Sequence, residues 1–220
     1  MEIWWEDWYV DEVLLLMRMR QINFPEKYDS IDIILDLNFY NNILKRYTEL
    51  TNETTDPSVV PMEVRLAEFK WDDEVVDYCR GVRPYPGGCS WAGAKRVFTV
   101  MNIEVTHFVT LEFNIEEGVV NVYDCNVPVY SDDAFFCFMQ PVMELWLKLL
   151  KQSGMFAHLP AKLLNELWEF NRLKNLPRNV TSRVCHSWSI AFMEALLTST
   201  TVTKPESLIS NNSVWRMQWR

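Results

Sequence analysis

The clearest pattern in the chain is a run of three short segments in which β-branched and aromatic residues predominate. We predict strands at Val97–Ile103, His107–Phe113 and Val119–Asp124, because such residues are typical of strands and short polar links separate the segments. The link Ile115–Gly118 has the composition of a turn, so the last two strands are expected to form an antiparallel hairpin.

The hairpin is expected to bring a histidine and a carboxylate together at its open end. If its centre lies between Ile115 and Glu116, His107 is directly opposite Asp124, and opposed residues have Cβ atoms roughly 5 Å apart on one sheet face. A bulge at Gly118 would shift the pairing by one residue and leave both groups at the same end. An adjacent carboxylate fixes the tautomer of a histidine and stabilises its charged form. The alternative is that His107 is an ordinary strand end and Asp124 a turn former.

Apolar residues recur at helical spacing in several other segments. These patterns predict helices at Val10–Arg20, Ile31–Tyr47, Asp72–Tyr78, Asp132–Leu150 and Ser187–Leu197. Polar or turn-rich loops are expected at Thr48–Ser58, Arg80–Gly93 and Arg172–Val184. The segment His158–Trp168 is ambiguous, and the pattern does not place the polar tail from Thr198 to Arg220.

Composition narrows the class of protein. The 220 residues are 49% hydrophobic, which is typical of a globular domain, and the net charge of −9 argues against a nucleic-acid surface. The acidic N-terminus is unlike a signal peptide, and no apolar run approaches the roughly 18 residues that span a bilayer. We therefore expect a soluble, intracellular protein without a membrane or nucleic-acid partner. We further expect a monomer in the nucleus or cytoplasm.

The cysteines and histidines give no sign of a bound metal. The chain has five cysteines without a C-x-x-C spacing and three histidines without a metal-ligand pattern, so we expect reduced thiols and neither a metal nor another cofactor. Cys185 stands where a polar loop meets the predicted final helix. Unpaired backbone N–H groups and the helix dipole stabilise a thiolate there, as a thiol nucleophile requires. Alternatively, Cys185 is a small buried residue at a helix start.

Short motifs in a fixed order surround these residues. They are Trp4–Asp11 followed by Met17–Arg20, Tyr78–Pro84 with Trp91, Val100–Phe108, Val120–Cys125, and Arg172–Asn179 followed by Ser182–His186. This order resembles that of the ubiquitin-like-protein-specific cysteine proteases, the SUMO proteases, and is most similar to a divergent plant branch. The resemblance covers roughly Trp4 to Leu197.

The resemblance implies a papain-like α+β fold, with a mostly antiparallel central sheet and helices packed around it. One catalytic domain would span residues 1–198, with a mainly helical part at 1–95 and the sheet and nucleophile helix at 96–198; the tail 199–220 lies outside it. It also implies hydrolysis after the Gly-Gly terminus of a SUMO-like modifier. Cys185 would be the nucleophile, His107 the base and then the acid, and Asp124 the residue that orients His107.

The resemblance further assigns substrate contacts and marks departures from the family pattern. Trp4 and Phe108 would clamp the Gly-Gly segment, because two flat rings exclude any residue with a larger side chain. Asn179 stands where the family has its oxyanion glutamine, and Val184 and His186 replace the Asp and Gly beside the nucleophile. These changes leave two further interpretations open: an impaired relative that only binds ubiquitin-like modifiers, and a decaying transposon-associated copy.

Overall fold

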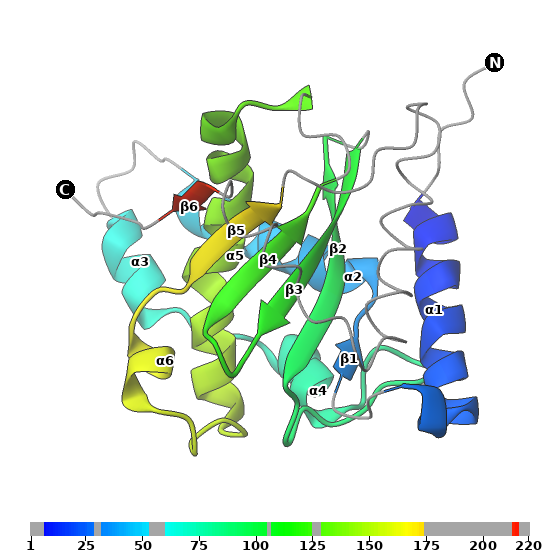
Figure 1. Ribbon diagram of the computed structural model, residues 1–220. Coiled ribbons are helices and arrows are strands. Elements are labelled where there is room, and N and C mark those ends of the chain that lie inside the picture. Colours follow the sequence, from blue (N-terminus) through cyan, green and yellow to red (C-terminus); the bar gives the residue numbers. More distant parts are fainter. Residues whose placement is uncertain are drawn as a thin grey trace.

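The computed structural model describes residues 7–28, 32–52, 60–104, 107–124 and 129–173, together with the backbone of a strand at 213–215. Its centre is a six-stranded mixed sheet in which the strands lie in sequence order (Figure 1). The strands are β1 (Asp32–Ile34), β2 (Arg96–Ile103), β3 (His107–Asn114), β4 (Val119–Tyr123), β5 (Glu169–Leu173) and β6 (Ser213–Trp215). The pairs β1–β2 and β4–β5 are parallel, and the other three pairs are antiparallel. The α+β fold with a mostly antiparallel sheet is confirmed.

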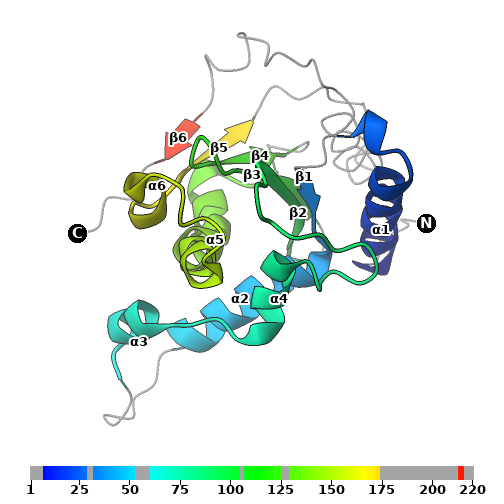
Figure 2. The same ribbon diagram turned by 90° about the horizontal axis from the view of Figure 1, so that it is seen from below.

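Helices cover both faces of this sheet (Figure 2). The described helices are α1 (Asp7–Asn23), α2 (Leu37–Thr51), α3 (Met62–Glu68), α4 (Asp73–Arg80), α5 (Asp132–Ser153) and α6 (Ala161–Asn165), with a 3-10 turn η1 at Pro25–Lys27. Alternate residues of β2 divide between the two faces. Val97 and Met101 join the core beneath α2, α4 and α5, whereas Phe98 and Val100 pack against α1. The α1 helix is thereby separated from the larger core by the sheet.

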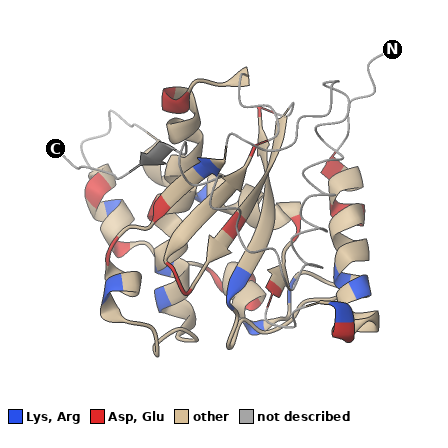
Figure 3. Ribbon diagram, viewed as in Figure 1, with Lys and Arg blue, Asp and Glu red and all other residues tan. Residues whose placement is uncertain are grey.

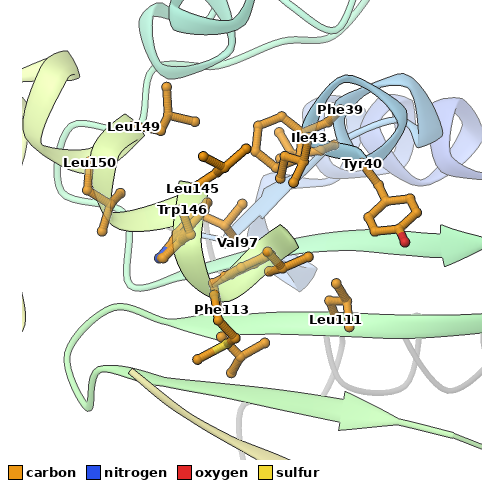
Figure 4. Close-up of a cluster of buried hydrophobic side chains, with 14 of the residues drawn as sticks. Phe39, Tyr40, Ile43, Val97, Leu111, Phe113, Leu145, Trp146, Leu149 and Leu150 are labelled. Carbon is orange, nitrogen blue, oxygen red and sulfur yellow. The ribbon is translucent and has the colours of Figure 1, made fainter. Parts of the chain in front are cut away.

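The larger core is built around Trp146 of α5 (Figure 4). Its indole stacks on Phe113 of β3 with ring centroids 3.9 Å apart, and Phe39 of α2 approaches it edge-on at 6.4 Å. Ser131 caps α5 at its start by accepting a hydrogen bond from the Ala134 N–H. This packing fixes α5 across the sheet face to which His107 and the alternate β3 residues Val109 and Leu111 belong.

Several predicted elements agree with the structure and others do not. The strands β2, β3 and β4 and the helices α1, α4 and α5 lie where the pattern predicts them, with ends that differ by a few residues. The helix predicted from Ile31 is wrong at its start, because Asp32–Ile34 pairs with β2 and α2 begins only at Leu37, after its N-cap Asp36. The helix α2 continues to Thr51, so the loop predicted from Thr48 begins too early.

The loop predicted from Arg172 is also wrong at its start. Arg172 and Leu173 belong to β5, which pairs with β4. Within the tail that the sequence pattern does not place, Ser213–Trp215 pairs with β5 as the edge strand β6. The final helix predicted at Ser187–Leu197 lies outside the described residues.

Charged residues of both signs are distributed over the helices and strands of the described chain (Figure 3). Within that part of the chain, none of the helices combines the length and the apolar character that crossing a membrane requires. The same residues contain no cluster of three histidine, cysteine, aspartate or glutamate side chains arranged to hold a metal ion.

Candidate active site

The two residues predicted to meet at the end of the hairpin do meet, but through a different register. The observed pairing sets Thr110 opposite Tyr123, and extending it by one residue sets Asp124 opposite Val109. His107 is therefore the diagonal neighbour of Asp124 on the same sheet face, rather than its direct partner. The predicted direct opposition is wrong because Ile115–Gly118 forms a four-residue turn, with Gly118 in the left-handed region at φ 67°.

His107 and Asp124 form a buried hydrogen bond. The Nε2 atom of His107 lies 2.9 Å from Oδ1 of Asp124, and the two residues are 4% and 1% exposed. An ionised carboxylate only accepts hydrogen bonds, so it selects the tautomer in which Nε2 carries the proton. The Nδ1 atom, on the other side of the ring, is then the atom that can accept a proton from a nucleophile.

Arg172 binds the second carboxylate oxygen of Asp124. Its Nε and Nη2 atoms donate to Oδ2 over 3.0 Å and 2.6 Å. Its Nη1 donates to the Tyr130 carbonyl oxygen over 3.0 Å and to Oδ1 of Asp132 over 3.1 Å. The guanidinium also lies over the Phe135 ring, 4.2 Å from its centroid. Asp124 thus stands between an imidazole and an arginine.

Sequence reasoning missed this arginine as a site residue. Arg172 is only 1% exposed, yet an arginine in a polar-looking segment predicts a solvated loop. The available signal in the sequence was the alternation of apolar Trp168 and Phe170 with polar Glu169 and Asn171, which places Arg172 on the same side as the apolar residues. Alternation with a period of two is the pattern of a strand.

The Tyr130 ring lies beside the His107 ring. The two ring centroids are 5.9 Å apart, and the Tyr130 hydroxyl donates to Glu104 over 3.0 Å. Glu104 lies directly after β2, with a positive φ of 51°. The hydrogen bond therefore connects the β2–β3 link, which precedes His107 in the chain, to the residues that precede α5.

A second buried polar cluster holds the end of β4 from the opposite face of the sheet. The Tyr123 hydroxyl donates to the Glu112 carboxylate, and the Asn121 amide donates to the same carboxylate over 3.1 Å. Burial and the neighbouring Glu112 charge raise the pKa of Tyr123 well above its usual value, so this residue is a hydrogen-bond donor at neutral pH. These bonds fix the strand residue that immediately precedes Asp124.

Phe108 lies on the opposite face from His107. It is 3% exposed and packs with the α1 cluster, and its register partner on β2 is Asn102. The Asn102 amide donates to Oδ1 of Asp7 over 2.7 Å, which attaches the first residue of α1 beside Phe108. Trp4, its predicted partner in the clamp, lies outside the described residues.

The predicted nucleophile and oxyanion residue also lie outside the described part of the chain. These are Cys185 and Asn179, and their roles stay predictions. Among the described cysteines, Cys79 is fully buried, and burial raises the pKa of its thiol to about 12. Cys79 is therefore a protonated core residue at neutral pH, without the character of a nucleophile.

Comparison with models of known protein families gives a match over most of the chain. The model of the Ulp1 protease family, C-terminal catalytic domain, matches residues 11–220. No curated protein matches the chain.

Proposed function

The chain belongs to the Ulp1 protease family, a family of cysteine proteases that act on ubiquitin-like modifiers, and we propose that it hydrolyses the bond after the Gly-Gly terminus of a SUMO-like modifier. The observation that carries the proposal is the buried hydrogen bond between His107 Nε2 and Asp124 Oδ1. It supplies the oriented base that a thiol nucleophile needs. Cys185 is proposed as that nucleophile because it precedes the last predicted helix in the family's cysteine motif.

The proposed reaction follows the thiol protease sequence. His107 Nδ1 takes the proton of the Cys185 thiol, and the thiolate attacks the carbonyl carbon of the terminal glycine. His107 then returns the proton to the leaving amine as the carbon–nitrogen bond breaks, which leaves a thioester. A water molecule, deprotonated by His107, hydrolyses the thioester and releases the modifier. Asp124 accepts the Nε2–H bond throughout and stabilises the imidazolium.

We propose that Phe108 and Trp4 bind the Gly-Gly segment between their rings. The hydrogen bond between Asp7 and Asn102 supports this proposal, because it holds the start of α1 next to the strand position opposite Phe108. Trp4 is only three residues before Asp7, a span of about 10 Å at most for extended chain. The N-terminal aromatic segment therefore has the reach that the clamp requires.

The oxyanion side of the site distinguishes this chain from the family pattern. We propose that the Cys185 backbone N–H and the Asn179 side chain donate to the developing oxyanion, Asn179 with a shorter reach than the family glutamine. Loss of one such donor costs about 10²–10³ in rate, so slow hydrolysis is expected. Asn179→Gln should raise turnover, and His186→Gly should add to this gain by opening the approach to Cys185.

The test is cleavage of a SUMO precursor by the wild-type chain, with Cys185→Ala and His107→Gln as controls. We expect slow hydrolysis that either substitution abolishes. Binding of SUMO is measured in parallel by calorimetry. If the folded wild-type protein binds SUMO but neither it nor Asn179→Gln turns over the precursor, the protein is a modifier-binding relative and the proposed hydrolysis is wrong. Cleavage that persists in Cys185→Ala would refute the assignment of the nucleophile.

A further inference from the structure

We infer that Arg172 is a positioning residue of the proposed active site, which keeps Asp124 ionised and aimed at the His107 ring. This inference rests on the proposed function, and it concerns how the histidine is prepared for catalysis. Arg172 lies on β5 and His107 on β3, Asp124 directly follows β4 between them, and the three residues share one sheet face. Arg172 is the register partner of Val122, which lies two residues before Asp124 on β4.

The geometry divides the carboxylate between two partners. Oδ1 of Asp124 meets His107 at 2.9 Å, and Oδ2 receives the Nε and Nη2 donors of Arg172. The planar guanidinium holds the carboxylate by two bonds, which fixes the direction of Oδ1 as well as that of Oδ2. A single flexible partner would leave the carboxylate free to turn away from the ring.

The charges give Arg172 a second effect. Asp124 is 1% exposed, and a buried carboxylate without a cation is costly, so it tends to take up a proton. A protonated Asp124 would donate to Nε2 of His107 and move the imidazole proton to Nδ1, where it blocks proton transfer from a thiol. The guanidinium compensates the Asp124 charge at a distance of 2.6 Å from Nη2 to Oδ2 and thereby maintains the productive tautomer.

Arg172 also fixes the position of Tyr130 in the site. Its Nη1 donates to the Tyr130 carbonyl oxygen and to Asp132, the first residue of α5. Tyr130 is the residue whose ring stands 5.9 Å from that of His107. The Arg172 guanidinium therefore fixes the positions of both Asp124 and Tyr130, which lie beside the His107 ring.

The experiment compares Arg172→Met and Arg172→Lys with a matched control, Arg96→Met. Arg96 also pairs with a buried aspartate, Asp32, through an Nε–Oδ1 bond of 2.8 Å. It lies seven residues along β2 from the position opposite His107, or about 23 Å at the strand rise. The readouts are the His107 tautomer, from 15N-histidine NMR spectra, and the kcat and KM for SUMO with a fluorogenic group after Gly-Gly.

We expect Arg172→Met to move the imidazole proton to Nδ1 and therefore to lower kcat by up to about 10⁴-fold, as for other catalytic histidines that lose the correct tautomer, with KM changed less than twofold. Arg172→Lys retains the positive charge but loses the planar guanidinium that binds the carboxylate by two bonds. It should therefore keep the Nε2–H tautomer and lose about tenfold in kcat. Arg96→Met should alter neither readout, although it removes the bond to the buried Asp32 and a 3.9 Å contact with Glu112, because Tyr123 and Asn121 still bind Glu112 on the opposite sheet face. If the methionine variant does not fold, the lysine variant decides by its kcat.

A folded Arg172 variant with the wild-type kcat and His107 spectrum would overturn the inference. The tautomer readout separates this result from failure of the proposed function, because it needs no turnover. If wild type is inactive but Arg172→Met still moves the imidazole proton, the positioning role stands and the proposed hydrolysis fails. If wild type is active and Arg172→Met leaves the His107 spectrum unchanged, the proposed hydrolysis stands and the positioning role of Arg172 fails.

Discussion

Replacing Asp124 with asparagine exchanges one carboxylate oxygen for an NH2 group within an unchanged outline. The remaining oxygen has two candidate partners, and Arg172, which donates over 3.0 Å and 2.6 Å, is expected to retain it. The new NH2 group then faces Nε2 of His107, where two donors cannot share one hydrogen bond. The imidazole should respond by moving its proton to Nδ1, which is the wrong tautomer for a base that receives a thiol proton.

The expected cost in stability follows from the burial of the pair. Removing one partner of a buried ion pair typically costs 3–5 kcal/mol. Asparagine keeps an acceptor for Arg172, and Asp132 still binds Nη1, so we expect about 3 kcal/mol. For a chain of this size that corresponds to a fall in Tm of about 6–12 °C. The loss in kcat should approach about 10⁴-fold, as for other catalytic histidines that lose the correct tautomer.

Urea unfolding and turnover of a SUMO precursor measure the two effects. Asp73→Asn is the control, because Asp73 pairs with Arg80 at 3.3 Å but has an 89% exposed side chain. An exposed ion pair contributes less than about 1 kcal/mol, so this substitution should leave both measurements nearly unchanged. If Asp124→Asn costs less than about 1 kcal/mol and stays within tenfold of the wild-type rate, the description of a buried His–Asp–Arg arrangement is wrong.

Three further substitutions or reactions test other parts of the structure. Trp146→Ala should lower the free energy of unfolding in urea by about 3–5 kcal/mol. Trp8→Ala, at a position that is 54% exposed, should lower it by less than about 1 kcal/mol. Similar losses for the two variants would contradict the assignment of the core. Because burial raises the pKa of Cys79 to about 12, iodoacetamide at pH 8 should modify Cys185 in the folded protein and spare Cys79, as peptide mass mapping would show. Asn102→Ala should raise the KM for a SUMO substrate severalfold and cost about 1 kcal/mol or less in stability, and an unchanged KM would remove the support for the clamp.

The strands of the hairpin were predictable because their pattern is local. Both faces of β3 are buried, and the segment is rich in β-branched and aromatic residues, which favour strands wherever they pack. The register of the hairpin was harder to predict from the sequence than its strands, because it depends on the number of residues in the turn. Asn114 accepts the Gly118 N–H through its backbone and the Glu117 N–H through its side chain, and this closes a four-residue turn in place of a two-residue loop.

The elements that the pattern missed depend on partners far away in the sequence. Asp32–Ile34 reads as the start of a helix, but its pairing with Arg96–Phe98 makes it a parallel strand. Arg172 reads as a loop residue, and its burial depends on partners such as Asp124, 48 positions earlier in the sequence. Conversely, the local hairpin pattern places His107 and Asp124 at one end of the hairpin, and their contact is observed there. Their catalytic roles stay predictions. The domain limits at residues 1–198 stay a prediction.

The central claim is that Cys185 is a nucleophile served by the His107–Asp124 pair. The most direct measurement uses SUMO with an electrophilic propargylamide in place of its terminal carboxylate, followed by mass spectrometry of the intact protein and of its peptides. We predict a single covalent adduct on Cys185, absent from Cys185→Ala and strongly slowed in His107→Gln. A folded protein that binds the probe without forming an adduct, or that forms it on a different cysteine, would contradict the claim.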